Sequence, residues 1–135
     1  MKALIISLAL VVNVHDGDTL TLDDGRTIRL AGIDAPEIGQ PYGEQSRDEL
    51  KRMIKRDVRI VPTTTDRYGR TVADIYVGNR CVNREMVHRG AAWWFRRYAP
   101  KDHCMRELEA SARKHKRGLW RAPDVVAPWD WRKSK

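Results

Sequence analysis

The sequence predicts an α+β fold: a small barrel of five β-strands, with one helix inserted after the third strand and two C-terminal helices. Three observations support this prediction. Short apolar, β-branched segments separated by turn residues dominate the chain as far as residue 78. One amphipathic segment, residues 44–56, interrupts them. Beyond residue 82 the apolar residues recur instead at helical spacing.

The first three strands are expected over residues 8–14, 20–22 and 27–30. The first segment is largely apolar and β-branched, and the second alternates between apolar and polar residues. Asp23-Asp24-Gly25 lies between the second and third segments and is typical of a tight turn. These segments therefore predict one strand followed by a hairpin.

A helix is expected next, over residues 44–56, because the apolar residues fall on one helical face and the charges elsewhere. Residues 58–61 and 72–77 are predicted to form the fourth and fifth strands, since both are rich in β-branched residues. Residues 66–70 form the turn between them.

Two helices are expected after the strands. The first begins at Asn83, which can act as its N-cap, and ends at Gly90. The second covers about residues 102–116 and stops before Gly118. The tail, residues 121–135, holds prolines and tryptophans, so we expect an irregular arm packed by its indole rings.

This order of elements favours an OB-type barrel, an architecture whose strand face and loops bind oligonucleotides. Neither an internal repeat nor a linker divides the 135 residues. We therefore expect one domain over residues 1–135.

The start of the chain allows two interpretations. Residues 1–10 combine a charged start with an apolar run, as the beginning of a secretory signal does. No A-x-A cleavage site follows, and the run continues into the first predicted strand. It is also too short to span a bilayer. The segment is therefore either a strand or an export signal, and an exported, periplasmic or cytoplasmic location all stay open.

The composition points to a polyanionic partner. Lys and Arg outnumber Asp and Glu by 26 to 18, which gives a net charge of +8. Such a surplus attracts nucleic acid, although it can also serve solubility alone. The chain has two cysteines, Cys81 and Cys104, which are too few and too far apart in sequence for a zinc site. They can form one disulfide or remain two thiols, and the sequence does not decide between these states.

Four polar segments lie where a packed core does not need them. They are Asp16-Gly17-Asp18-Thr19, Arg29, Asp34-Ala35-Pro36-Glu37 and Tyr68-Gly69-Arg70. Each one alone also fits an ordinary role: a turn, a solvent-facing arginine, a solvated loop and a hairpin. Pro36, however, forces the residue before it into an extended conformation. The carboxylates of Asp34 and Glu37 are therefore held apart on a stiff turn.

Together these segments fit the hydrolysis of a phosphodiester. Asp18 and Asp34 offer the hard oxygen ligands that Ca²⁺ prefers, although such ligands also admit Mg²⁺ or Mn²⁺. Arg29 and Arg70 can grip phosphate oxygens through bidentate hydrogen bonds. Glu37 can position or deprotonate the attacking water.

The order of these motifs resembles the staphylococcal nuclease (thermonuclease) family. The resemblance rests on VHDGDT at 14–19, RLAGIDAPE at 29–37 and DRYGR at 66–70. It implies an OB-fold nuclease that hydrolyses DNA and RNA, uses Ca²⁺ and leaves 3′-phosphate ends. We expect a preference for single strands, a monomer and no stable protein partner. The tail, residues 127–132, is similar to the ending of many Gram-negative relatives.

By position, the resemblance implies metal ligands at Asp18, Asp34 and the backbone carbonyl of Ala35. Asp16 matches an acid behind these ligands. Glu37 matches the proposed general base, a role that is debated within the family.

The resemblance also implies the substrate contacts. Arg29 and Arg70 match two phosphate-binding arginines, and Tyr68 matches a tyrosine near the phosphate. Arg67 and Tyr98 are further expected contacts with the nucleic acid. The alternative is a non-catalytic OB-fold module that binds nucleic acid. We favour the enzyme, because two metal carboxylates would repel a polyanion unless a cation bridged them.

Overall fold

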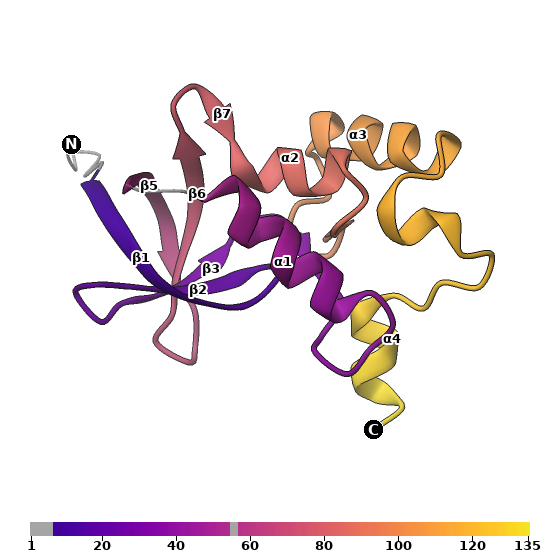
Figure 1. Cartoon of the computed structure of the whole chain (residues 1–135), viewed down its shortest axis with the longest axis horizontal. Coiled ribbons are helices and arrows are strands. Elements are labelled where there is room, and N and C mark those ends of the chain that lie inside the picture. Colours follow the sequence, from indigo (N-terminus) through magenta and orange to yellow (C-terminus); the bar gives the residue numbers. More distant parts are fainter. Residues whose placement is uncertain (1–6, 55–56) are drawn as a thin grey trace.

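The structure is a computed structural model that describes residues 7–54 and 57–135 (Figure 1). Its strands are β1 (Ser7–Asp16), β2 (Thr19–Leu22), β3 (Thr27–Leu30), β4 (Ile33–Asp34), β5 (Asp57–Thr65), β6 (Thr71–Val77), β7 (Arg80–Cys81) and β8 (Trp93–Trp94). Its helices are α1 (Gly43–Met53), α2 (Val82–His88), α3 (His103–Lys114), the 3₁₀ turn η1 (Gly118–Arg121) and α4 (Pro128–Lys133).

Five of the strands close into a barrel, which confirms the predicted α+β fold. The main sheet has the order β3-β2-β1-β5-β6-β7, and a pairing of β3 with β6 closes it. All neighbouring pairs in this sheet are antiparallel except β3 and β6, which run parallel. The two-residue strands β4 and β8 form a separate antiparallel pair beside the barrel.

The barrel interior follows from the alternation of the strands. Buried side chains at every second position of β2, β3, β5 and β6 point inward; they are Leu20, Leu22, Ile28, Leu30, Val58, Ile60, Ala73 and Ile75. Helix α1 packs on β1 through its buried face, and α2 packs on β6. The helices therefore cover the barrel on one side, as Figure 1 shows.

The expected N-cap role of Asn83 is wrong. Helix α2 begins one residue earlier, with Cys81 at its N-cap position. The fully buried Asn83 instead accepts a hydrogen bond from the Ile75 backbone N–H at 2.9 Å. Its amide donates to the carbonyls of Ala31 at 3.0 Å and Ala73 at 3.1 Å. Asn83 therefore ties α2 to β6 and to the end of β3, next to the parallel pairing that closes the barrel.

The tail is more regular than the expected irregular arm, because it contains helix α4; the 3₁₀ turn η1 ends at Arg121, where the tail begins. Of its two indoles, Trp129 packs against a second apolar cluster that includes Trp93, Trp120 and Ala127, and Trp131 is not part of this cluster. Helix α4 lies beside the loop that leads into α1 (Figure 1). The tail thus returns to the barrel.

The structure also bears on the start of the chain, the cysteines and the possibility of a membrane-spanning helix. Strand β1 includes residues 7–10 of the apolar start, while residues 1–6 lie outside the described part. Cys81 and Cys104 are both free thiols. Within residues 7–54 and 57–135, no helix has the length and apolar character needed to cross a membrane.

Replacing Asn83 by alanine is expected to lower the free energy of unfolding by about 3 kcal/mol, because buried backbone groups lose their partners. Urea unfolding followed by circular dichroism measures this loss. The exposed Asn79 offers a matched control, and Asn79→Ala should change stability by less than about 0.5 kcal/mol. Equal effects of the two substitutions would contradict the closing role of Asn83.

Candidate active site

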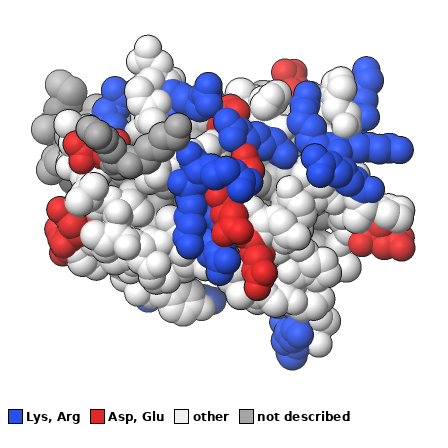
Figure 2. Space-filling model, viewed as in Figure 1, with Lys and Arg blue, Asp and Glu red and all other residues white. Residues whose placement is uncertain are grey.

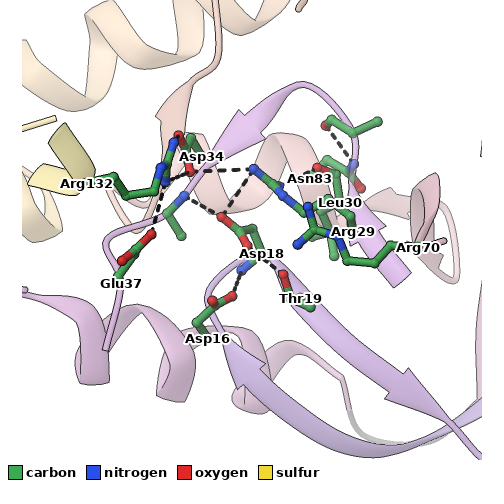
Figure 3. Close-up of polar contacts among 12 residues, drawn as sticks. Asp16, Asp18, Thr19, Arg29, Leu30, Asp34, Glu37, Arg70, Asn83 and Arg132 are labelled. Atoms are coloured by element: carbon green, nitrogen blue, oxygen red, sulfur yellow. Dashed lines mark hydrogen bonds and ion pairs between the residues drawn. The ribbon is translucent and has the colours of Figure 1, made fainter. Parts of the chain in front are cut away.

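The acidic and basic residues singled out by the sequence converge in one place (Figure 3). Asp16 and Asp18 come from the tight turn between β1 and β2, and Arg29 comes from β3. Asp34 ends β4, and Glu37 follows in the loop before α1. Five side chains from four segments therefore meet beside the barrel.

Gly17 allows this convergence. A Cβ atom at this position would lie 2.7 Å from the Cβ of Ala35 and 2.8 Å from that of Ser46, closer than packed side chains allow. The β1–β2 turn can therefore approach the 34–35 segment only with glycine here. As a result the Ala35 N–H reaches the Asp18 carboxylate and donates to Oδ2 at 2.8 Å.

Asp18 is a buried, well-bonded carboxylate. The Thr19 hydroxyl donates to its Oδ1 at 2.8 Å, and the Arg29 guanidinium lies 3.5 Å from its Oδ2. Burial raises the pKa of Asp18, but the charge of Arg29 and the hydrogen bonds together outweigh burial and bring the pKa below its usual value. Asp18 is therefore ionised at neutral pH.

Arg29 lies between two carboxylates. The same nitrogen, Nη2, is 3.5 Å from Asp18 Oδ2 and 3.5 Å from Asp34 Oδ1. Its other terminal nitrogen donates to the Leu30 carbonyl at 2.9 Å. With its side chain only 13% exposed, Arg29 is an inward arginine rather than the solvent-facing one that the β-strand alternation allows.

Asp34 is held by a residue that the sequence did not indicate. Its side chain is 1% exposed, and Arg132 from α4 donates to Oδ2 at 2.7 Å and to Oδ1 at 3.2 Å. Burial raises the pKa of Asp34; the hydrogen bond from Arg132 opposes this rise, but the charge of Asp18 adds to it. In the sequence, Arg132 belongs to the segment 127–132 that is similar to the ending of Gram-negative relatives, but this similarity assigns it no role in the site.

Glu37 is placed by the loop that leads into α1. Its backbone N–H donates to the side chain of Gln40 at 3.1 Å. A Cβ on Gly43 would collide with the carbonyl of Glu37, so this helix start also requires a glycine. The Glu37 carboxylate is 40% exposed and lies 3.3 Å from Arg132 Nη1. It therefore faces solvent at the mouth of the acidic cluster.

Asp16 lies behind Asp18. The Asp18 N–H donates to Asp16 Oδ1 at 3.0 Å. Burial, reinforced by the negative charge of Asp18, raises the pKa of Asp16 to about 7. Ionisation of Asp16 in the folded protein is therefore unfavourable below neutral pH.

Apart from Arg29, the predicted substrate residues lie outside the acidic cluster. Arg70 bonds to Asp66 at 2.7 Å, and Figure 3 shows it on the same side of the cluster as Arg29. Tyr68 is 69% exposed and Tyr98 is 73% exposed, which leaves both rings open to a ligand. Arg67 lies over the Tyr68 ring at 4.9 Å.

The chemistry of the cluster fits a hard divalent cation. Four carboxylates lie around two guanidinium groups, so negative charge is in excess. Each ionised carboxylate also offers about four lone-pair sites, more than the hydrogen bonds use. Within residues 7–54 and 57–135, no three His, Cys, Asp or Glu side chains converge to hold a metal by themselves. Asp18 and Asp34 would therefore need backbone carbonyls and waters as further ligands.

Comparison with known proteins decides the class. Residues 27–122 match the family described as "Staphylococcal nuclease homologue". The chain belongs to this family. An "Uncharacterized endonuclease" of Escherichia coli O157:H7 is 42% identical over 130 residues, which cover 93% of this chain and 84% of that protein. A "Micrococcal nuclease" of Shigella flexneri is 38% identical over 138 residues, covering 92% and 79%.

A plant nuclease is similar to this chain over part of its own length. The "Staphylococcal-like nuclease CAN1" of Arabidopsis thaliana is 39% identical over 109 residues, covering 80% of this chain and 33% of that protein. These findings confirm the resemblance to staphylococcal nuclease and the enzyme class: the chain is a nuclease that acts on nucleic acid. They decide against the non-catalytic module.

Asp16→Asn is expected to stabilise the protein at pH 8 in the presence of EDTA. Because the pKa of Asp16 is raised from 3.8 to about 7, the folded state binds a proton between these values that the unfolded state releases. The wild-type protein therefore loses stability as the pH rises from about 4 to about 7. The asparagine side chain of the variant does not ionise, so the variant avoids this loss. Urea unfolding should give a gain of up to about 4 kcal/mol at pH 8 that vanishes near pH 4.

The exposed Asp24 is the control, because hydrogen bonds from Arg26 hold the pKa of this carboxyl below its usual value. Asp24→Asn should stabilise at neither pH. A gain from Asp16→Asn that is equal at both pH values would contradict the raised pKa.

Proposed function

We propose that this nuclease hydrolyses DNA and RNA by metal-assisted attack of water on the phosphodiester, with Ca²⁺ as the metal and 3′-phosphate ends as products. The observation that best supports the proposal is the position of Arg29 between the buried carboxylates of Asp18 and Asp34. An ion-pair network of purely structural value would gain little from burying so much like charge.

Asp18, Asp34 and the carbonyl of Ala35 are the proposed metal ligands, with Asp16 behind them. A bound divalent cation would neutralise phosphate charge and act as a Lewis acid. Hydrogen bonds from Thr19 and Ala35 hold Asp18 in a fixed orientation. Partners of this kind orient metal ligands and strengthen binding.

Arg29 and Arg70 are the proposed phosphate-binding groups. A guanidinium offers five N–H donors, and those not used by Asp18, Asp34 and Leu30 are available to phosphate oxygens. Charge-assisted bonds of this type strengthen as negative charge develops in the transition state. The two arginines therefore stabilise the reacting phosphate.

Glu37 is the proposed general base. Its carboxylate is the one in the cluster with substantial exposure, at 40%, so water can reach it. Water attacks phosphorus, Glu37 takes its proton, and the bond from phosphorus to the 5′ oxygen breaks. The 5′ oxygen takes a proton from solvent water and leaves as a hydroxyl group, the phosphate stays on the 3′ oxygen, and Glu37 returns its proton to solvent.

The substrate surface is proposed to favour single strands. Tyr68 and Tyr98 are exposed aromatic rings, and unpaired bases can stack on such rings. Arg67 places a positive charge beside Tyr68. Figure 2 shows Lys and Arg side chains gathered over α3, and a second group interleaved with acids where α1 and α2 lie. A site built on phosphate contacts reads few base edges, so base specificity should be weak.

The whole chain is proposed to act as one monomeric domain. The family match ends at residue 122, whereas Arg132 in the tail contacts both Asp34 and Glu37. Residues outside the matched range therefore contribute to the same site.

Hydrolysis of heat-denatured DNA and of RNA is expected with millimolar Ca²⁺ and should stop when the chelator EGTA is added. Excess Ca²⁺ should restore it, and mass spectrometry of the fragments should find 3′-phosphate ends. Activity that survives the chelator would contradict metal dependence. Higher activity with Mg²⁺ or Mn²⁺ would contradict the choice of Ca²⁺ alone.

Glu37→Gln is expected to lower kcat by about 10²–10⁴-fold, because the amide cannot accept the proton of water. The fold should be unaffected, since Glu37 is 40% exposed. Glu44→Gln makes the same change at an exposed glutamate in the first turn of α1 and serves as the matched control. Loss of only a fewfold in the Glu37 variant would remove the general-base role.

A further inference from the structure

Arg132 joins the active site from the far end of the sequence, 98 residues after Asp34. Its Nη2 donates to Asp34 Oδ2 at 2.7 Å. Its Nη1 is shared, at 3.2 Å from Asp34 Oδ1 and 3.3 Å from Glu37 Oε1. One planar guanidinium therefore spans two carboxylates that the proposed mechanism uses for different tasks (Figure 3).

The position of Arg132 is set by packing and not by the acids alone. Trp129, on the same short helix, stacks on Phe95 at 5.5 Å with an interplanar angle of 11°. The same indole meets Trp93 edge-on at 5.4 Å. Ala127 and Pro128 at the helix start are buried. Helix α4 is thus anchored on an apolar surface next to the site.

The geometry of α4 determines the direction in which Arg132 points. Trp129 and Arg132 are three residues apart, so they project from the same face of the helix. Packing the indole against Phe95 therefore directs the guanidinium toward Asp34. A second link holds the facing loop: the Gln40 side chain donates to the Val126 carbonyl at 2.7 Å. Gln40 also accepts from the Glu37 N–H at 3.1 Å.

Glu37 depends on this arrangement. Among the contacts of residues 7–54 and 57–135, Arg132 is the only side chain that bonds to the Glu37 carboxylate. Without it, a 40%-exposed glutamate on a loop samples several rotamers. Asp34, by contrast, is buried and also faces Arg29.

We propose that Arg132 is a positioning residue of the nuclease reaction: its shared Nη1 fixes the Glu37 carboxylate at a set distance from Asp34. This inference rests on the proposed function, because it assumes that Glu37 handles the attacking water and Asp34 holds the metal. Arg132 acts through Glu37, so its guanidinium need not contact the substrate.

The contact is compatible with a metal at Asp34. The guanidinium uses one lone-pair site on each Asp34 oxygen, and an ionised carboxylate has about four such sites. Arg132 can therefore orient the proposed metal ligand Asp34 without blocking the metal site. Loss of such partners typically costs 10–100-fold in metal affinity or activity.

The test is a double-mutant cycle between Arg132→Gln and Glu37→Gln, measured as kcat and KM on denatured DNA with saturating Ca²⁺. Arg132→Gln should lower kcat about 10–100-fold with KM changed less than about threefold. In the Glu37→Gln background the same substitution should cost almost nothing more, because saturating Ca²⁺ offsets a loss of metal affinity at Asp34 and the remaining effect runs through Glu37. Arg132→Lys should recover only part of kcat. Lysine keeps the positive charge, but its single ammonium group cannot span both carboxylates as the guanidinium does.

Lys133→Gln is the matched control, because it removes the same charge from the neighbouring, exposed position of α4. It should leave kcat, KM and thermal stability at wild-type values. Calorimetric titration with Ca²⁺ in the absence of nucleic acid adds a readout independent of turnover. The Arg132→Gln protein should bind Ca²⁺ no more tightly than wild type.

Four outcomes would overturn the inference. Raised activity and tighter Ca²⁺ binding would make Arg132 an inhibitory plug, and a raised KM with unchanged kcat would make it a direct substrate contact. Fully additive losses in the cycle would show that Arg132 does not act through Glu37. An Arg132→Gln variant as active as the Lys133→Gln control would leave the proposed function intact without this role. An inactive wild type with every metal would instead overturn the proposed function itself.

Discussion

The concentration of negative charge beside the barrel is the constraint on which the rest of this structure depends. Carboxylates repel one another and lose hydration when buried, so each must find compensation within the protein. Asp18 finds it in the N–H of Ala35 and in Arg29, and Asp34 finds it in Arg132. Asp16 is not fully compensated, which is why its pKa is raised to about 7. The cluster therefore keeps negative charge that the protein does not fully offset, and the cation proposed above would reduce it.

The barrel converts this constraint into a fixed geometry. Its parallel closure between β3 and β6 brings Arg29 level with Val72, close to the turn that carries Arg70. Asn83 satisfies backbone groups at this closure from the first turn of α2. A buried polar network of this kind is rigid when every member is bonded. Arg29, one of the proposed catalytic residues, therefore extends from a fully bonded part of the barrel.

The sequence predicted the barrel because its signals are local. Alternating strands, the turn at Asp23-Asp24-Gly25 and the amphipathic face of α1 each act over a few residues. The acids and Arg29 were also found from sequence, since they sit in short motifs with recognisable order. The family match covers residues 27–122, a range that includes Arg29, Asp34 and Glu37.

Asn83 and Arg132 escaped prediction because their partners are distant in sequence. An asparagine near a helix start is an N-cap by local rules, yet here three backbone groups from β6 and the end of β3 bind it instead. Arg132 lies in a segment where prolines and tryptophans indicated packing but not direction. Local patterns cannot specify which groups a chain brings together across 98 residues.

The long separation between Arg132 and its partners has a consequence for the order in which the protein assembles. Contacts of high sequence separation form late, since closing a longer loop costs more chain entropy. A six-residue helix that contacts the rest of the protein through Trp129, two buried residues at its start and the ion pairs of Arg132 can also detach without unfolding the barrel. Its amide hydrogens should therefore exchange with solvent long before those of β2 and β3. The last element to dock would then be the one that completes the reacting geometry, and a half-folded chain would hold its acids without the group that aligns them.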